Sequence, residues 1–413
     1  MLTQNLAEIV NEDTNQKNSR KPTQMTMTPF IPYGRQSITQ TDITAVVEVL
    51  QSDWITQGPT IPAFEQAVAS ICGVNHGVAV NSATSALHIA CLALGLGPGY
   101  GLWTVPNTFV ASANCGRYCG AEVDFVDIDP KTYNLSVPAL GKKLAIARER
   151  GNLPQVLIPV HFAGQSCDMD AIYSLSQEYN FRIIEDASHA VGAQYRGEPV
   201  GNCHYSDITI FSFHPVKIIT TGEGGMALTN NPDLATRMSR LRTHGITRDS
   251  DLLSGKLVGD WVYEQVELGF NYRVTDIQAA LGLSQLQRLP DFIARRRQLA
   301  AQYDYLLADM PLILPWQHPD ALSAWHLYVV QVEESAKLNR EELFGALRRS
   351  GIGVQVHYIP VHLQPDYQRL GFREGDFPVA ESYYGRAISL PMYPGLSDAD
   401  QLRVVETLRQ VLE

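Results

Sequence analysis

The sequence predicts an α/β protein with a large domain, in which a mostly parallel mixed sheet lies between layers of helices, and a smaller α+β domain after it. Short apolar runs alternate with amphipathic helical segments between about residues 78 and 186. Repeated strand-then-helix order indicates a mainly parallel sheet with helices on both faces. The 413 residues, of which 45% are hydrophobic, suffice for two domains. We expect the large domain to span residues 28–288 and the small one 289–413.

Residues 1–27 are polar and offer almost no apolar face, so we expect a disordered extension. Met25 and Met27 are alternatives to Met1 as the true start. No apolar run reaches the roughly 18 residues that span a bilayer, and the N-terminus lacks the pattern of a signal peptide. These features predict a cytoplasmic protein that does not enter a membrane.

Charge and cysteine content exclude other classes of protein. The net charge of -11 is spread along the chain, whereas nucleic-acid binding would need a clustered basic face. The six cysteines are scattered, which favours reduced core thiols over a disulfide framework. Cys115 and Cys119 form the only close pair, and no second pair completes a zinc site, so we expect no metal.

The first candidate for ligand binding follows a short strand at Val78–Val80. Asn81-Ser82-Ala83-Thr84-Ser85-Ala86 leads from this strand into a helix over 87–94. A helix N-terminus with small hydroxyl side chains is a ready site for an anion such as phosphate. Taken alone, these residues are explained better by plain helix capping through Ser82 or Thr84.

The alternation continues along the chain to a pair of carboxylates. Further strands are expected at 102–106, 123–128, 156–160 and 181–186, with helices after Phe109, at 138–150 and around 172–179. Phe109 follows a strand end, where an aromatic ring either joins the core or stacks on a planar ligand. Asp186 and His189 also follow a strand end, and ligands of open α/β sheets bind there. A protonated ring nitrogen of a ligand would partner Asp186, although a helix cap or an arginine would also do so.

Lys217 is the leading candidate for catalysis. It lies between a buried strand over 207–213 and a turn formed by glycines 222, 224 and 225, which leads into a strand over 226–229. Desolvation there would disfavour the ammonium form and lower the pKa of the lysine, as an amine needs in order to react with an aldehyde. An ordinary lysine with its head in water is the alternative that the local pattern leaves open.

The rest of the chain predicts a helix and then the small domain. Thr275 and Gln278 form a capping box, and Ile277, Leu281 and Leu286 are expected at the core of the helix that follows. The arginines at 295–297 are expected on a solvated face. The small domain should contain strands at 325–332 and 353–358, a helix at 340–350, and a final helix with an apolar stripe of Leu402, Val405, Leu408 and Leu412. His357, Tyr358 and His362 could line a substrate pocket, and each is equally well explained as a structural residue.

Together these segments resemble the DegT/DnrJ/StrS sugar-nucleotide aminotransferases, which are fold-type I pyridoxal phosphate enzymes. The resemblance covers nearly the whole chain from about residue 30. It is carried by 56–59, 81–87, 185–187, 212–214 with Lys217, 222–225, 269–273 and 275–278. Within the family the chain is most similar to the aminotransferases of the pseudaminic-acid pathway, on the segments 213–217 and 354–358. Tyr100 departs from the family, which usually has an acidic residue after Gly-Pro-Gly.

The resemblance implies a role for each candidate. Lys217 would bind pyridoxal 5'-phosphate covalently and move a proton, while Asp186 would keep the ring nitrogen protonated. His189 would face the phenolic oxygen of the cofactor, and Phe109 would stack on its ring. The remaining contacts would be with the cofactor phosphate, from Ala83, Thr84 and Ser212 within one subunit and from Asn271 of the other subunit of a homodimer with shared active sites.

The implied reaction is the transfer of an amino group from L-glutamate, which leaves as 2-oxoglutarate. The acceptor would be the 4-keto carbon of a UDP-linked N-acetylated 4-keto-6-deoxy sugar, giving UDP-4-amino-4,6-dideoxy-N-acetyl-β-L-altrosamine for pseudaminic acid biosynthesis. Another nucleotide-linked keto sugar, carried on dTDP or GDP, is the first alternative. A pyridoxal phosphate-binding regulator without turnover is the second. Relatives that deoxygenate sugars have histidine in place of the lysine, so Lys217 argues against that chemistry.

Overall fold

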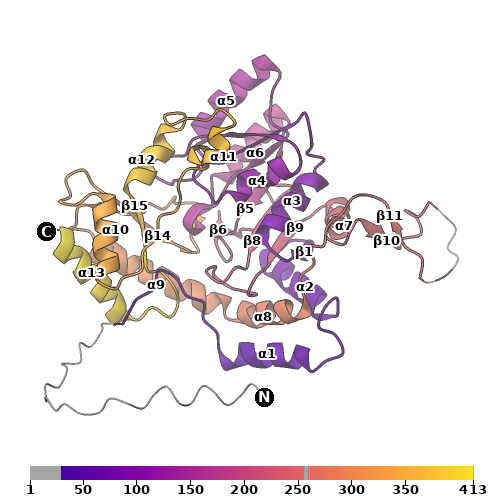
Figure 1. The fold of residues 1–413 in the computed structure, drawn as a ribbon, viewed down its shortest axis with the longest axis horizontal. Coiled ribbons are helices and arrows are strands. Elements are labelled where there is room, and N and C mark those ends of the chain that lie inside the picture. The colour runs from indigo at the N-terminus through magenta and orange to yellow at the C-terminus, as the bar shows by residue number, and fades with distance from the viewer. Residues whose placement is uncertain (1–28, 255–258, 260, 413) are drawn as a thin grey trace, which may run out of the picture.

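The computed structural model describes residues 29–254, 259 and 261–412, and the expected disordered extension at 1–27 lies outside them. A seven-stranded sheet forms the centre of the protein (Figure 1). In spatial order its strands are β1 (His76–Val80), β9 (Gly225–Thr229), β8 (Ile208–Ser212), β5 (Arg182–Asp186), β4 (Val156–Ile158), β2 (Gly101–Thr104) and β3 (Glu122–Phe125). The pairs from β8 to β3 are parallel, whereas β9 is antiparallel to both β1 and β8. The sheet is therefore mixed and mostly parallel, as predicted.

Helices cover both faces because every core strand is apolar on both sides. On β5, Ile184 packs with α3, α4 and α7, while Ile183 faces the opposite layer with α5 and α6. On β8, Phe211 faces α2, α8 and α9. The helices of this large unit are α1 (Gln40–Leu50), α2 (Thr60–Cys72), α3 (Ala83–Ala93), α4 (Ala111–Tyr118), α5 (Val137–Arg150), α6 (Met169–Tyr179), α7 (Pro232–Leu241), α8 (Asp276–Gln287) and the start of α9 (Leu289–Leu306).

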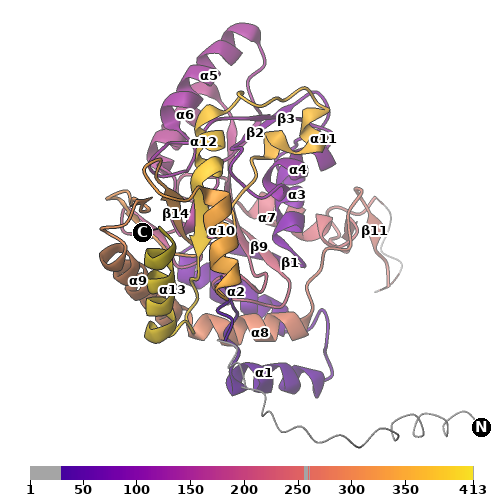
Figure 2. The same ribbon diagram turned by 60° about the vertical axis from the view of Figure 1, so that its left-hand side comes forward.

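The C-terminal part forms a second cluster around a three-stranded antiparallel sheet in the order β12-β14-β15 (Figure 2). Its elements are β12 (Leu312–Ile313), β14 (Tyr328–Val332), α10 (Arg340–Arg349), α11 (Pro365–Gln368), α12 (Pro378–Arg386), β15 (Ala387–Leu390) and α13 (Asp398–Leu412). Ile31 joins this cluster, because Gly353 N–H donates to its carbonyl at 2.6 Å. The N-terminal end of the described chain therefore packs with the C-terminal part.

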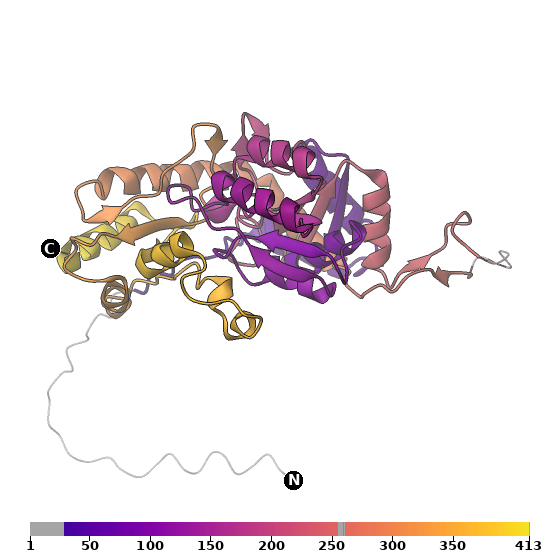
Figure 3. The ribbon, with the colours of Figure 1, turned by 90° about the horizontal axis from the view of Figure 1, so that it is seen from above.

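Short strand pairs complete the fold. β6 (Gln194–Tyr195) lies between β7 (Glu198–Pro199) and β13 (Ala321–Leu322), which ties the large unit to the C-terminal part. β10 (Ile246–Thr247) and β11 (Glu264–Gln265) form an arm that projects away from the body (Figure 3). Trp261 and Leu268 near this arm are 73% and 78% exposed. These are among the most exposed large apolar side chains of the described residues.

The expected strand at 353–358 does not form. Gln355 makes only an isolated bridge with Ser389, and the backbone then leaves the sheet, because the Tyr358 N–H donates to the Asn107 side chain at 3.3 Å. This contact directs the segment toward the large unit.

Two expected apolar stripes are shifted by polar packing. On α8 the side chains of Ile277 and Leu281 are only half-buried. Asp276 is buried instead, and its carboxylate accepts the N–H groups of Gly58 and Thr60 at the start of α2. On α13, Leu402 is 42% exposed, whereas Gln401 is buried and donates to the Leu299 carbonyl at 2.8 Å.

The expectation that residues 295–297 form a solvated face is wrong for Arg296. Its side chain is 2% exposed and its guanidinium donates to the carbonyls of Trp325, His326 and Met392 at 3.0–3.1 Å. Buried carbonyls without a hydrogen-bond donor cost free energy. Arg296 therefore fastens two segments of the C-terminal part onto α9.

We expect Arg296→Met to lower the free energy of unfolding by about 3 kcal/mol, because three buried carbonyls lose their donor. Arg297→Met is the matched control, since Arg297 is half-buried and makes one hydrogen bond, to the Ser323 carbonyl at 3.3 Å. Urea unfolding followed by circular dichroism measures both. Equal, small losses in the two variants would contradict the structural role assigned to Arg296.

Candidate functional site

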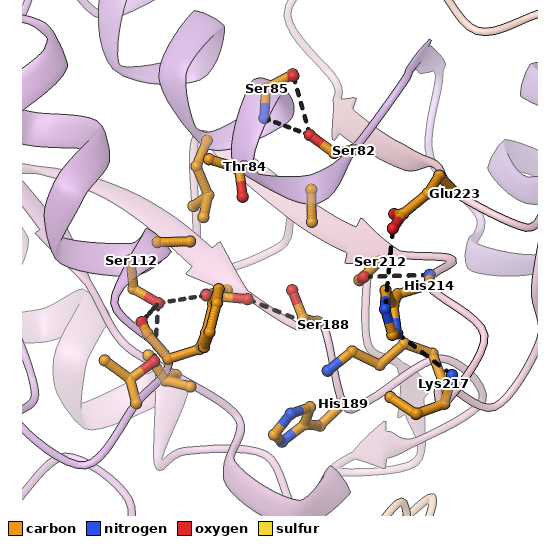
Figure 4. A pocket seen from close by; sticks show the side chains of 18 of the residues that line it. Ser82, Thr84, Ser85, Ser112, Ser188, His189, Ser212, His214, Lys217 and Glu223 are labelled. Carbon is orange, nitrogen blue, oxygen red and sulfur yellow. Dashed lines mark hydrogen bonds and ion pairs between the residues drawn. The ribbon is translucent and has the colours of Figure 1, made fainter. Parts of the chain in front are cut away.

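A cavity of about 800 Å³ opens at the carboxyl ends of β5 and β8, where the N-termini of α3 and α4 also point (Figure 4). This is the edge of a parallel sheet at which α/β proteins bind ligands. The residues that line the cavity come from segments far apart in the sequence: Tyr33, Asn81, Ser82, Ala83, Thr84, Ser85, Leu87, Thr108, Phe109, Ala111, Ser112, Val160, Asp186, Ser188, His189, Ser212, His214, Val216, Lys217, Glu223, Gln278 and Tyr358.

The turn from β1 into α3 forms an anion cradle. The Ser82 hydroxyl oxygen caps the helix by accepting the Ser85 N–H at 3.1 Å. The other first-turn N–H groups of a helix lack acceptors within it, so those of Ala83 and Thr84 remain for a ligand. Gly225 on β9 lies directly against this turn, since a Cβ atom there would fall 2.5 Å from the Ala83 nitrogen. Only a glycine lets β9 approach the turn this closely, and this close contact holds the cradle in place.

Asp186 ends β5 as a carboxylate that is only 5% exposed. One oxygen accepts the Ser112 hydroxyl at 2.6 Å, and the other accepts the Ser188 N–H at 3.1 Å. Burying a charge is costly unless it is hydrogen-bonded and paired. Both oxygens of Asp186 have a donor, and the carboxylate is suited to a cationic partner in the cavity.

Lys217 lies in the turn after β8, where its N–H donates to the His214 carbonyl at 2.9 Å. Its side chain crosses the cavity toward Ser188 and His189 (Figure 4). Burial lowers the pKa of Lys217 to about 8, and the Asp186 carboxylate partly opposes that shift. This lysine thus has the desolvated amine that the sequence predicted.

Three buried histidines stay uncharged at one wall of the site, where His189 lines the cavity and His326 and His357 lie behind it. Burial lowers the pKa of His189 well below its usual value, and Lys217 and His357 lower it further. Burial likewise depresses the pKa of His326, whose ring centroid lies 4.4 Å from that of His189. Burial and Lys217 lower the pKa of His357 to about 3. This wall supplies neutral hydrogen-bonding groups rather than positive charge.

The structure brings most of the predicted site residues together around the cavity. These are Ala83, Thr84, Phe109, Asp186, His189, Ser212, Lys217 and Tyr358. His357 lies behind the lining and bonds Ser389 through Nδ1 at 2.7 Å. His362 lies elsewhere, buried against Phe377 and paired with Glu381. Asn271 is exposed outside the cavity, beside Asn81.

Sequence reasoning missed several residues that the fold adds to the site. Ser112 holds Asp186, and it lies in the first turn of α4, three residues after Phe109. Tyr33 and Ser188 line the cavity. His326 comes from a distant segment, and no local pattern marked it. Among the described residues, no cluster of three or more His, Cys, Asp or Glu could hold a metal ion.

Comparison with known proteins agrees with this geometry. The model of the DegT/DnrJ/EryC1/StrS aminotransferase family matches residues 36–409. The spore coat polysaccharide biosynthesis protein SpsC of Bacillus subtilis is 41% identical over 389 residues, which cover 93% of this chain and 97% of SpsC.

Solved structures with the same fold include two with close overall agreement. Spr1654 from Streptococcus pneumoniae, in its PLP form, has a TM-score of 0.84 and 32% identity, with 92% of this chain and 98% of that chain covered. Helicobacter pylori PseC, an aminotransferase involved in pseudaminic acid biosynthesis, has a TM-score of 0.83 and 30% identity, with 93% and 99% covered.

We expect Gly225→Ala to weaken binding of pyridoxal phosphate on the order of 10-fold, about 1.4 kcal/mol, because the new methyl group displaces the anion cradle. Gly141→Ala is the control, since a Cβ atom at Gly141 on α5 meets nothing within 4 Å. Fluorescence titration of the apo-protein with the cofactor measures both affinities. Unchanged affinity in Gly225→Ala would show that the cradle does not contact the phosphate.

Proposed function

The chain belongs to the DegT/DnrJ/EryC1/StrS aminotransferase family, and we propose that it transfers an amino group from L-glutamate to the 4-keto carbon of a UDP-linked N-acetylated 4-keto-6-deoxy sugar. The family and the solved neighbours make it a fold-type I sugar aminotransferase that uses pyridoxal phosphate. The proposal adds the donor, the nucleotide and the sugar. The single observation that carries the chemistry is the desolvated Lys217 amine beside the buried Asp186 carboxylate.

The residues of the cavity fit pyridoxal phosphate. The cradle of Ala83 and Thr84, with Ser212 across the cavity, suits a phosphate. Asp186 suits a protonated ring nitrogen, and the exposed ring of Phe109 suits stacking on a planar group. When bound, the cofactor supplies an aldehyde for the amine and an electron-withdrawing ring.

Lys217 carries and moves the proton in this proposal. With a pKa of about 8, about one amine in ten is neutral at pH 7, and only the neutral amine attacks an aldehyde or removes a proton. Asp186, whose two oxygens accept from Ser112 and Ser188, would hold the protonated ring nitrogen. His189, which burial keeps neutral, would donate to the phenolic oxygen.

The names of the relatives support a UDP-linked substrate. The diphosphate of such a substrate needs more positive charge for binding than the cavity of one chain provides. PseC and SpsC act in pseudaminic acid and polysaccharide biosynthesis by their names. Lys217 is the only lysine or arginine among the described residues that line the cavity. A diphosphate needs cationic or N–H partners. A second chain therefore completes the proposed site.

That second chain is the partner in the proposed homodimer. The projecting arm exposes Trp261 and Leu268, as expected of a surface that is covered in the dimer. Asn271 is exposed outside its own cavity, and the proposal assigns it to the cofactor phosphate of the other subunit. The proposal places the enzyme in the cytoplasm, a reducing compartment in which its six buried free cysteines stay reduced. No helix of the described chain is both long and apolar enough to cross a membrane.

We expect Lys217→Ala to abolish both the covalent link to the cofactor and turnover, a loss of roughly 10³-fold or more. Lys142→Ala, which changes an exposed lysine of α5, should behave as wild type. In wild type the rate of covalent attachment should rise with pH and level off above about pH 8, because the neutral amine reacts. Borohydride labelling with peptide mapping locates the link, and a label on another lysine would sink the assignment.

The identity of the proposed acceptor is tested by incubating the enzyme with glutamate and a panel of UDP-, dTDP- and GDP-linked 4-keto sugars. Mass spectrometry then identifies the products. The proposal expects amination of the UDP-linked N-acetylated sugar at the highest kcat/KM. Preference for a dTDP- or GDP-linked sugar would replace the substrate and leave the class of enzyme intact. Cofactor binding without amination of any sugar would favour the regulator instead.

The shared site predicts complementation between two inactive variants. Lys217→Ala disables its own cavity, and Asn271→Asp disables the partner's by placing a carboxylate against the cofactor phosphate. A mixed dimer contains one site with both wild-type residues. Random mixing yields about half mixed dimers, so about a quarter of full activity should return in the mixture and about half in the isolated mixed dimer. Co-expression with two tags and double purification isolates the mixed dimer, and no recovery would mean that Asn271 serves its own subunit.

A further inference from the structure

We propose that Tyr358 is the specificity-determining residue that distinguishes a keto substrate from its aminated form, because its hydroxyl is held as a hydrogen-bond donor in the cavity by His189. The inference rests on the proposed function, since it concerns the oxygen atom that the amino group replaces. It follows from the order of donors and acceptors in a short chain of hydrogen bonds.

The series of hydrogen bonds begins at the backbone of Ala163. Its N–H donates to Nδ1 of His189 at 3.3 Å. A ring nitrogen that accepts a hydrogen bond carries no proton, and a neutral imidazole then carries its proton on the other nitrogen. Burial keeps His189 neutral, as its lowered pKa indicates. Nε2 of His189 is therefore the protonated nitrogen.

The next member is the Tyr358 hydroxyl, which lies 3.1 Å from Nε2 of His189. A protonated Nε2 donates, so the tyrosine oxygen accepts and its own proton must point elsewhere. No other described residue accepts that proton. Tyr358 lines the cavity, and its hydroxyl therefore offers one donor to a bound ligand. This remains true if Nε2 donates instead to the cofactor, because a protonated Nε2 still cannot accept from Tyr358.

Neighbouring residues hold this series of hydrogen-bonded groups rigidly. Ala163 has a left-handed backbone at φ 57°, a conformation that costs free energy in a residue other than glycine and persists only where neighbours enforce it. Gly164 beside it leaves no room for a side chain, because a Cβ atom would lie 2.9 Å from the Trp325 nitrogen. The ring of His326 packs on His189. The donor at Tyr358 is thus preorganised before a ligand arrives.

The donor also keeps its proton at working pH. Burial raises the pKa of Tyr358 far above its usual value, and Asp186 and Tyr33 raise it further. A carbonyl oxygen can only accept a hydrogen bond, whereas an ammonium group can only donate one. A fixed donor in the cavity that Lys217 lines therefore offers a hydrogen bond that the keto oxygen of either substrate can accept and an ammonium group cannot.

The experiment uses the full-length protein loaded with pyridoxal phosphate and two probes, 2-oxoglutarate and glutarate, which differ by the carbonyl oxygen. Isothermal titration calorimetry measures both dissociation constants. Wild type should bind 2-oxoglutarate more tightly than glutarate. Tyr358→Phe should lose about 5- to 10-fold in affinity for 2-oxoglutarate and keep its affinity for glutarate.

Tyr303→Phe is the control variant, because it removes a buried hydroxyl that bonds the Pro391 carbonyl at 3.0 Å, away from the cavity. It should leave the ratio of the two affinities unchanged. His189→Gln, whose amide can still accept from Ala163 and donate to Tyr358, should keep the preference for 2-oxoglutarate. The ratio is measured within one preparation, so partial unfolding of a variant does not imitate the effect.

Equal weakening of both probes in Tyr358→Phe, or no weakening, would overturn the inference. A wild type that loads cofactor on Lys217 but binds both probes equally would overturn it as well, while leaving the proposed aminotransferase intact. A wild type that forms no covalent link with the cofactor would overturn the proposed function and this inference together.

Discussion

The site depends on one constraint, which is that the Asp186 carboxylate is buried at the end of β5. A buried charge is tolerated only with donors on both oxygens and a cation nearby. The donors come from Ser112 on α4 and from the Ser188 backbone. The carboxylate therefore fixes the position of α4 and leaves the cavity suited to a positively charged ring.

Glu185, the residue before Asp186, has partners of its own, which leaves Asp186 to face the cavity. Glu185 points to the opposite face of the sheet, since side chains alternate along a strand. It pairs there with His161 at 2.7 Å and accepts the hydroxyls of Ser206 and Thr209. Burial would raise the pKa of Glu185, but these partners lower it. Two adjacent acids thus have separate partners, and only Asp186 faces the cavity that Lys217 lines.

Sequence patterns predicted what is local in this fold. The strands at Ile208–Ser212 and Arg182–Asp186, the capping box at Thr275 and the helix start at Ala83 all appear within a few residues of their expected bounds. Features that depend on distant partners were not predictable. Arg296 looks like part of a basic surface in sequence, and only the three carbonyls that converge on it explain its burial.

The histidine wall also depends on residues that are distant in the chain, so local patterns did not predict it. It also shows what joins the two parts of the molecule. His326 and Tyr358 come from the C-terminal part, whereas His189 belongs to the large unit. One apolar cluster contains Leu157 of β4 together with Leu327 and Tyr383. A shared core of this kind resists sliding, because packed interiors lose contacts when they are displaced. The position of Tyr358 relative to Lys217 is therefore set by core packing across the expected boundary at residue 288, and it does not require a ligand to close the two parts together.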